Sequence, residues 1–478
     1  MSLAVAVLPS CVNFGKKDRL FKVILCEIVY NKIMDENNNE TKKAEPVVNA
    51  QQVETATKNA ESTPVKKPLG RMKVGFYVGV GALAVAVVTA LVVVNLPQNN
   101  TESNNTGSAS DTTTDAATDT TAGAGEQVMS TSLTAGTVTT TIGGKTVTYN
   151  GAYVVDGINV TVSAGTYESA ADDQVVFLVI NGGSLKVDGN VLINKTGSAD
   201  FAGRGDDYSF YGTNSAVVVV GEGSSASING ATITSSVSGA NAVVATNGGT
   251  AVVAKTTINT TRDNSRGLHA TYGGTINADS TTISTLGGSC AALATDRGAG
   301  TVVAANMKLS TAGAGSPLIY STGAITVTNS TGTATGAQIA VVEGKNSINL
   351  QGCEFAANGN GNRNNVDNAG VMIYQSMSGD ASVGTGSFTA TDSTLTVLSS
   401  SSVYNTTPFF FVTNTDATID LTGSTISFAS AQPFISAVGT SEWGKSGSNG
   451  GKVTVSLSDT TSTNTTVNVD SISSVSGL

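Results

Sequence analysis

A repeat of about 25 residues between positions 216 and 322 restricts the fold more than any other feature of this sequence. One phrase of the repeat reads Thr-Ile-Thr at 232–234, Thr-Ile-Asn at 257–259 and Thr-Ile-Ser at 282–284. Its apolar residues are Ile233, Ile258, Ile283 and Leu309, a spacing of 25, 25 and 26 residues. Each unit contains short runs of Val, Ile, Thr and Ala between Gly-rich turns, a pattern typical of strands. One unit cannot bury an apolar face by itself, so the repeat predicts stacked coils of a parallel β-helix.

A second short segment recurs with the same spacing as the first. This second phrase can also be followed before residue 216 and after residue 322. Its apolar third position is occupied by Val179, Val218, Val243, Leu268, Ala292, Leu318, Ile339, Met372 and Phe410. The larger gaps before Val218, Met372 and Phe410 indicate loops inserted between strands, where function most often lies. We therefore expect an all-β fold over residues 128–478, a parallel β-helix of about a dozen coils.

This pattern resembles the right-handed parallel β-helix proteins of the pectin-lyase-like kind, above all the adhesin-like forms on bacterial surfaces. The resemblance covers about residues 137–478 and rests on periodicity and composition. It implies a right-handed solenoid at a cell surface. A shared fold does not assign an activity.

The segment before the repeat carries one membrane signal. Residues 74–96 contain no charged side chain, and a helix of that length spans a hydrocarbon core of roughly 30 Å. Basic residues precede this segment, and the next Lys or Arg is Lys145. The asymmetry predicts a single-pass helix with residues 1–73 as a disordered cytoplasmic region. Residues 97–127, rich in Ser, Thr, Asn and Asp, would be a disordered stalk that carries an extracellular β-helix. A cleaved signal peptide is the rival interpretation.

Composition and charge limit the partners. Charged residues make up only 13% of the chain, and Gly, Ser, Thr, Ala and Asn take their place. The net charge of the whole chain is −10, which argues against a nucleic-acid partner. Cys290 and Cys353 lie at different phases of the repeat, so we expect two buried thiols and neither a disulfide nor a metal pair.

An insert at residues 198–214 supplies the candidate ligand-binding residues, because aromatic rings beside carboxylates can stack on a sugar and bind its hydroxyl groups. A Ca²⁺ ion could also bind there, although no cofactor is required by the pattern. In the alternative interpretation, the aromatic residues only pin the loop to the coil. The candidates are Phe201, Asp206, Asp207, Tyr208 and Tyr211. A second insert at 356–368 is rich in Asn, and we expect it to be disordered.

The second phrase is apolar at consecutive positions, which indicates strands that are covered on both faces. If alternate residues point inward, an outward apolar stripe remains, and we expect it to serve self-association or adhesion. The stripe would consist of Val244, His269, Leu293, Ile319, Ile373 and Phe411.

No catalytic residue or metal ligand is predicted. Asn414-Thr415-Asp416 matches a polygalacturonase triplet, but no paired Asp or His follows it. A second polar group consists of Arg262, Asp263, Arg266, His269, Asp296 and Arg297. Arg266 and Arg297 lie at different ends of equivalent strands, which favours surface ion pairs over an acid/base pair.

The sequence as a whole predicts a membrane-anchored bacterial cell-surface protein, adhesin-like or structural, that binds glycans or a host or neighbouring cell surface. The alternative is a carbohydrate-active β-helix, either a glycan binder or a lyase or hydrolase of acidic polysaccharides. Carboxylates with Arg or Lys on adjacent coils would favour the enzyme.

Overall fold

The computed structural model describes residues 133–361, 366–443 and 449–478. The predicted cytoplasmic region, membrane helix and stalk all precede residue 133 and lie outside the described residues. Within the described ranges, no helix has the length and apolar character needed to cross a membrane.

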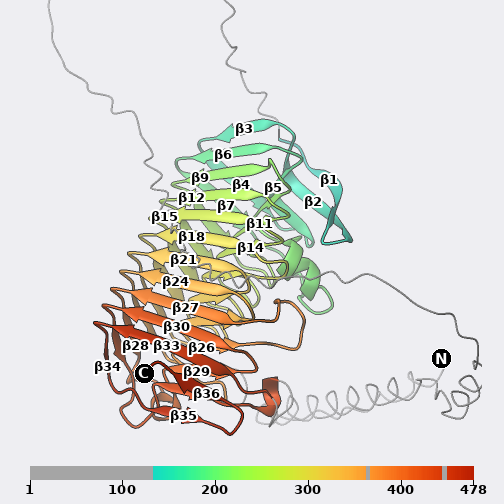
Figure 1. Ribbon diagram of the computed structural model, residues 1–478. Helices are drawn as coiled ribbons and strands as arrows, with labels where there is room; N and C mark the ends of the chain where they lie inside the picture. Colours follow the sequence, from blue (N-terminus) through green and yellow to red (C-terminus); the bar gives the residue numbers. More distant parts are fainter. Residues whose placement is uncertain (1–132, 362–365, 444–448) are drawn as a thin grey trace, which may run out of the picture. The chain divides into compact units, whose positions relative to one another are not determined.

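Three long sheets of stacked strands form the described part of the chain, as the repeat predicted (Figure 1). They have 13, 12 and 11 strands and are called sheets A, B and C. Successive strands of the chain pass from A to B to C, so each coil contributes one strand to each sheet. All neighbours pair in parallel except β1, which runs antiparallel to β2 and closes the first edge of sheet A. The expectation of about a dozen coils is confirmed.

Sheet A contains β1 (Gly136–Ile142), β2 (Lys145–Asp156), β5 (Gln174–Ile180), β8 (Val217–Val220), β11 (Val243–Thr246), β14 (Leu268–Thr271), β17 (Leu293–Thr295), β20 (Ile319–Ser321), β23 (Ala340–Glu343), β26 (Val371–Tyr374), β29 (Phe410–Thr413), β32 (Ile435–Ala437) and β35 (Val467–Val469). Sheet B contains β3 (Asn159–Val162), β6 (Ser184–Asp188), β9 (Ser225–Asn229), β12 (Thr250–Ala254), β15 (Thr275–Asp279), β18 (Thr301–Ala305), β21 (Ala324–Thr328), β24 (Ser347–Gln351), β27 (Gly386–Thr391), β30 (Ala417–Thr422), β33 (Lys452–Ser458) and β36 (Ser474–Ser476). Sheet C contains β4 (Gly165–Ser169), β7 (Val191–Lys195), β10 (Thr232–Ser235), β13 (Thr257–Thr260), β16 (Thr282–Thr285), β19 (Lys308–Thr311), β22 (Thr331–Ala334), β25 (Glu354–Ala357), β28 (Thr394–Val397), β31 (Thr425–Ser427) and β34 (Thr461–Ser462).

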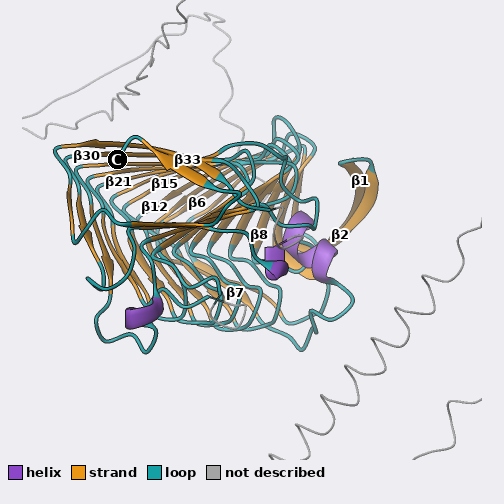
Figure 2. Cartoon of the chain, turned by 60° about the horizontal axis from the view of Figure 1, so that its bottom comes forward, coloured by secondary structure: helices purple, strands orange, loops and turns teal. Residues whose placement is uncertain are grey.

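In the described part of the chain, three short helices lie outside the stacked strands (Figure 2). They are η1 (Asp207–Tyr211), η2 (Tyr404–Thr406) and η3 (Ser441–Trp443). Two of them belong to the face of sheet A: η1 lies in the first insert, and η3 ends at a Trp that packs beside Tyr374.

The Thr-Ile phrase forms sheet C, and its strands stack in the register that the repeat predicts. Ile233 pairs with Ile258, Ile258 with Ile283, and Ile283 with Leu309. All four side chains are buried in the central core, while the flanking Thr232, a typical neighbour, faces solvent. Equal side chains at equal positions therefore produce one continuous core along the stack.

The corner between sheets C and A is narrow because glycines stack there. A Cβ on Gly313 would lie 1.8 Å from the carbonyl oxygen of Gly287 in the coil beneath. No side chain fits at that distance, so this corner depends on glycine for close approach of two backbones. The Gly-rich turns of the repeat thus determine how tightly the coils stack.

The expected apolar stripe is corrected by the register of sheet A. Leu293 pairs with Leu268 and with Ile319, and both Leu293 and Ile319 point into the central core. Ile373 is also a core residue. Only Val244, His269 and Phe411 face outward. All six side chains are at most 2% exposed.

The three outward members of the set are covered by the protein's own segments. Val244 packs with Phe210 and Tyr211 of the first insert, and His269 contacts Ser209 of the same insert. Phe411 belongs to a cluster that includes Met372 and Tyr374. The six residues therefore do not form an exposed contact surface.

Candidate functional site

Two outward rows of side chains run along sheet A, and inserted segments cover part of them. One row includes Val244, His269, Tyr320, Met372 and Phe411. The other row lies at the carboxyl ends of the strands, where Glu343 ends β23 and pairs with Tyr374, the last residue of β26. Since parallel strands end at a common edge, polar side chains from successive coils meet there.

The first insert is held against this face by its aromatic residues. Tyr208 and Tyr211 are 2% and 3% exposed. The Tyr149 hydroxyl donates a 2.7 Å hydrogen bond to the carbonyl oxygen of Tyr211, and the Tyr211 ring stacks on Tyr272 with centroids 5.4 Å apart. Phe201 is half-buried, with its ring centroid 6.4 Å from that of Tyr208. In this arrangement the tyrosines of the insert pack against the coil.

The two candidate carboxylates of the insert, those of Asp206 and Asp207, are paired with cations. Asp207 lies 2.9 Å from the ammonium of Lys145, and Asp206 lies 3.4 Å from the guanidinium of Arg297. In the described part of the chain, no three His, Cys, Asp or Glu side chains are grouped closely enough to hold a metal ion.

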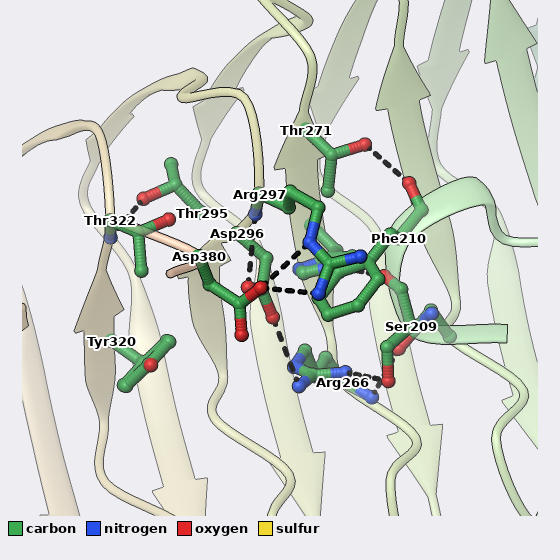
Figure 3. A network of polar contacts seen from close by, with 12 residues as sticks. Ser209, Phe210, Arg266, Thr271, Thr295, Asp296, Arg297, Tyr320, Thr322 and Asp380 are labelled. Carbon is green, nitrogen blue, oxygen red and sulfur yellow. Dashed lines mark hydrogen bonds and ion pairs between the residues drawn. The ribbon is translucent and has the colours of Figure 1, made fainter. Parts of the chain in front are cut away.

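Arg297 connects the first insert to a loop that follows β26 (Figure 3). Its Nε donates a 2.7 Å hydrogen bond to Asp380, and its guanidinium lies 3.8 Å from the centroid of the Phe210 ring. Asp380 and Asp206 come from loops 174 residues apart in the chain, yet both pair with this one side chain. Arg297 therefore clamps two insertions to the outer face of sheet A.

Arg266 pairs with Asp296 behind this clamp, and the pair is buried where we expected only surface ion pairs. The Arg266 guanidinium lies 3.3 Å from the Asp296 carboxylate, and their side chains are 12% and 7% exposed. Burial raises the pKa of Asp296 to about 6, although the nearby Arg266 opposes this shift. Arg266 precedes β14 and Asp296 follows β17, so the pair joins opposite ends of strands in two neighbouring coils.

The remaining members of the predicted Arg/Asp group do not join this network. His269 is fully buried, one ring nitrogen lies 2.7 Å from the carbonyl oxygen of Ser209, and burial lowers its pKa well below the usual value. Asp263 accepts a 2.7 Å hydrogen bond from the Gly288 amide at a turn. His269 and Asp263 thus hold segments of the fold together.

A cleft of about 440 Å³ opens on the outer face of sheet A beside Asp380. Its aromatic walls are Tyr320, Tyr374 and Trp443, and its carboxylates are Glu343, Asp367 and Asp380. Tyr374 and Trp443 meet edge to face with ring centroids 4.6 Å apart. The cleft therefore combines flat apolar surfaces with convergent acidic groups, the usual composition of a small-ligand site.

The carboxylate of Glu343 is held in this cleft by three hydrogen bonds. Its side chain accepts hydrogen bonds from the hydroxyl groups of Tyr320, Tyr374 and Ser376, with 2.9 Å between Tyr374 Oη and Glu343 Oε2. The residue is 1% exposed. Burial keeps the pKa of both phenols well above the usual value, so they remain protonated donors.

These cleft residues were not among the candidates that the sequence suggested. Tyr320 lies in the second phrase of the repeat, where its neighbours are core residues, and Glu343 and Tyr374 end strands three coils and more from the first insert. Their one sequence signal is that polar or aromatic side chains replace the small residues of equivalent positions, such as Thr246. The pairing register of β20, β23 and β26 brings Tyr320, Glu343 and Tyr374 together.

The second insert is more ordered than its composition suggested. Residues 356–361 and 366–368 are described, and Asp367 and Asn368 are both 2% exposed. The Gly361 amide donates a 2.9 Å hydrogen bond to Asn368, and Gln338 donates one of 3.1 Å to the carbonyl oxygen of Asp367. The expectation of disorder is wrong for these residues, because amide side chains satisfy the backbone of the loop.

Cys290 and Cys353 are buried free thiols, as expected. Burial raises the pKa of the Cys290 thiol to about 11, which suits a small packing residue and not a nucleophile.

A comparison with known protein families, curated protein sequences and solved structures finds no match to the chain.

Proposed function

We propose that this chain is a bacterial cell-surface protein that binds glycans in the cleft beside Glu343. In this proposal the solenoid is a right-handed β-helix of the pectin-lyase-like kind. Residues 74–96 anchor it in the membrane, and residues 97–127 hold it away from the surface. The anchor and stalk are supported by the apolar run and its basic flank.

The observation that carries the proposal is the joint presence of three aromatic rings and hydrogen-bonding carboxylates in one cleft. Tyr320, Tyr374 and Trp443 offer faces on which the apolar side of a sugar ring can stack. Ser376, Ser378 and Gln338 line the same cleft and can bind sugar hydroxyl groups.

Glycan hydrolysis is the second candidate, because Arg266 pairs with Asp296 on the next coil and Arg297 pairs with Asp380, which places carboxylates beside basic groups. The state of the carboxylates favours binding. Asp296 is buried and does not line the cleft, Asp380 is held by Arg297, and both Glu343 oxygens accept hydrogen bonds from hydroxyl groups. A general acid or base needs a carboxyl oxygen within reach of the scissile bond.

Co-elution of the full-length protein with polysaccharides in mild detergent tests the proposal. Cell-wall glycans, mucins and plant polysaccharides would be applied to a size-exclusion column with and without Ca²⁺. We expect the protein to shift to the elution volume of an unshortened polymer, and Trp443→Ala to remove the shift. Tyr404→Ala, a partly buried aromatic residue away from the cleft, is the matched control.

Shortened polymer would show that the second candidate is the right one. Elution of every polymer without the protein would contradict glycan binding.

A further inference from the structure

The charged residues that line the cleft beside Glu343, within the described part of the chain, are all acidic. Glu343, Asp367 and Asp380 contribute carboxylates, whereas no Lys, Arg or His is among the described lining residues. Asp380 is neutralised by Arg297 from behind. The described carboxylates would therefore disfavour a polyanionic ligand such as a uronic-acid polymer.

Glu343 differs from Asp380 because no cation among the described residues pairs with it. The described residues form six ion pairs, and Glu343 takes part in none of them. Its three hydrogen-bond donors are neutral hydroxyl groups. Burying a carboxylate is costly unless it is paired, and hydroxyl donors offset only part of that cost.

Tyr320 and Tyr374 line the cleft, and both donate hydrogen bonds to the Glu343 carboxylate. Each phenol directs its hydrogen to Oε2 of Glu343, so the lone pairs of both phenol oxygens remain as acceptors. A hydrogen bond to a carboxylate polarises the phenol and makes its oxygen a stronger acceptor. The two phenol oxygens lie 3.5 Å apart, close enough for one ammonium group to donate to both.

The aromatic rings suit the same ligand. A cation within about 6 Å of a Trp or Tyr ring face is attracted by the ring quadrupole. Trp443 and Tyr374 pack edge to face, so their ring faces point in different directions around the cleft. An ammonium group would therefore contact both π surfaces and the polarised phenols.

We propose that the cleft binds a glycan through a charged amino group, that is, an amino sugar that is not N-acetylated. This inference rests on the proposed function and specifies its ligand class. An N-acetyl group would remove the charge and add bulk at the point where the phenol oxygens accept. The shared chemistry is an ammonium group, whether a sugar or a simple alkylammonium ion carries it.

Calorimetric titration of the full-length protein separates these sources. The probes are a glucosamine tetramer with free amines, its N-acetylated counterpart, and methylammonium ion. At about pH 5, where the amines are charged, we expect the free-amine tetramer to bind at least about tenfold more tightly than the N-acetylated one. Glu343→Gln should abolish this preference, while Asp420→Asn, an exposed carboxylate on sheet B, should preserve it.

A second variant keeps the test decisive if Glu343→Gln fails to fold. Tyr320→Phe retains the ring and removes one phenol oxygen, and we expect it to reduce the preference for the free amine several-fold.

The outcomes distinguish the two proposals. Equal binding of both tetramers would overturn the amine inference and leave glycan binding intact. If neither tetramer binds but another glycan still co-elutes with the protein, the amine inference is overturned and glycan binding remains. Methylammonium binding as tightly as the free-amine tetramer would support recognition of the ammonium group and contradict the role of the sugar. Failure of all glycans would overturn both proposals.

Discussion

The Tyr374 hydroxyl donates a 2.9 Å hydrogen bond to Glu343, and the two residues occupy paired positions at the ends of β26 and β23. The pairing results from stacking of consecutive coils, because strands of equal length end side by side. Tyr320, one coil earlier, donates to the same Glu343 oxygen. One carboxylate thus connects three successive strands of sheet A.

Removing the Tyr374 hydroxyl should destabilise the protein. In Tyr374→Phe the ring remains, but Glu343 loses a donor in a buried site, a change that typically costs about 1–3 kcal/mol. Urea unfolding should therefore show a lower midpoint than in the wild type. The half-buried Tyr404, whose hydroxyl makes no contact with a carboxylate among the described residues, provides Tyr404→Phe as control. Equal midpoints for the two variants would contradict the role of this hydrogen bond.

Replacing Arg297 should release the first insert from sheet A. Arg297→Ala removes the contact with Phe210 and the pairs with Asp206 and Asp380, with an expected loss of about 2 kcal/mol. Limited proteolysis should cut within 198–214 faster in this variant than in the wild type. Lys186→Ala, which removes an exposed pair with Asp188, should leave the rate unchanged. An unchanged rate in Arg297→Ala would show that the aromatic residues alone hold the insert.

The buried Asp296 should make stability depend on acidity. Burial raises its pKa to about 6 in the folded protein, above the value of about 3.9 in an unfolded chain. The folded state therefore binds this proton more tightly, and its contribution to stability is present below about pH 4 and lost as the pH rises through about 6. The change is about 3 kcal/mol.

Asp296→Asn should flatten the dependence of unfolding free energy on pH between about 4 and 6. Asp420→Asn is the control, since that carboxylate is exposed on sheet B. Urea midpoints measured across this range would decide the matter. An identical slope in Asp296→Asn and the wild type would show that Asp296 is not the group responsible.

The corner between sheets C and A, where Gly313 stacks on Gly287, should tolerate no side chain. Gly313→Ala would place a methyl group 1.8 Å from the Gly287 carbonyl oxygen, so the two coils must separate. We expect a loss of about 3 kcal/mol or more, or failure to fold. At Gly136 a Cβ would lie 3.4 Å from Val154, an ordinary contact, so Gly136→Ala should change the melting temperature little. Similar melting temperatures for both variants would mean that the corner can relax.

Much of the solenoid could be predicted because its information is local and repeated. The 25-residue spacing of Ile233, Ile258 and Ile283 matches their pairing in sheet C. The apolar runs of sheet A were ambiguous. Leu268 pairs with Leu293 and not with Ala292, and a slip of one residue exchanges the inner and outer faces of a strand. Because both parities are apolar in these runs, the pattern itself does not choose between them.

The amino-acid sequence by itself determined the repeat, the all-β architecture, the approximate number of coils and the buried state of Cys290 and Cys353. Only the tertiary structure decided that Arg297 joins Asp206 to Asp380 and that Tyr320 and Tyr374 share Glu343. The physical reason is that a stacked coil brings together residues one or more repeats apart. Inserted loops of unequal length then fold back over those residues, and no periodic pattern in the sequence records where such loops make contact.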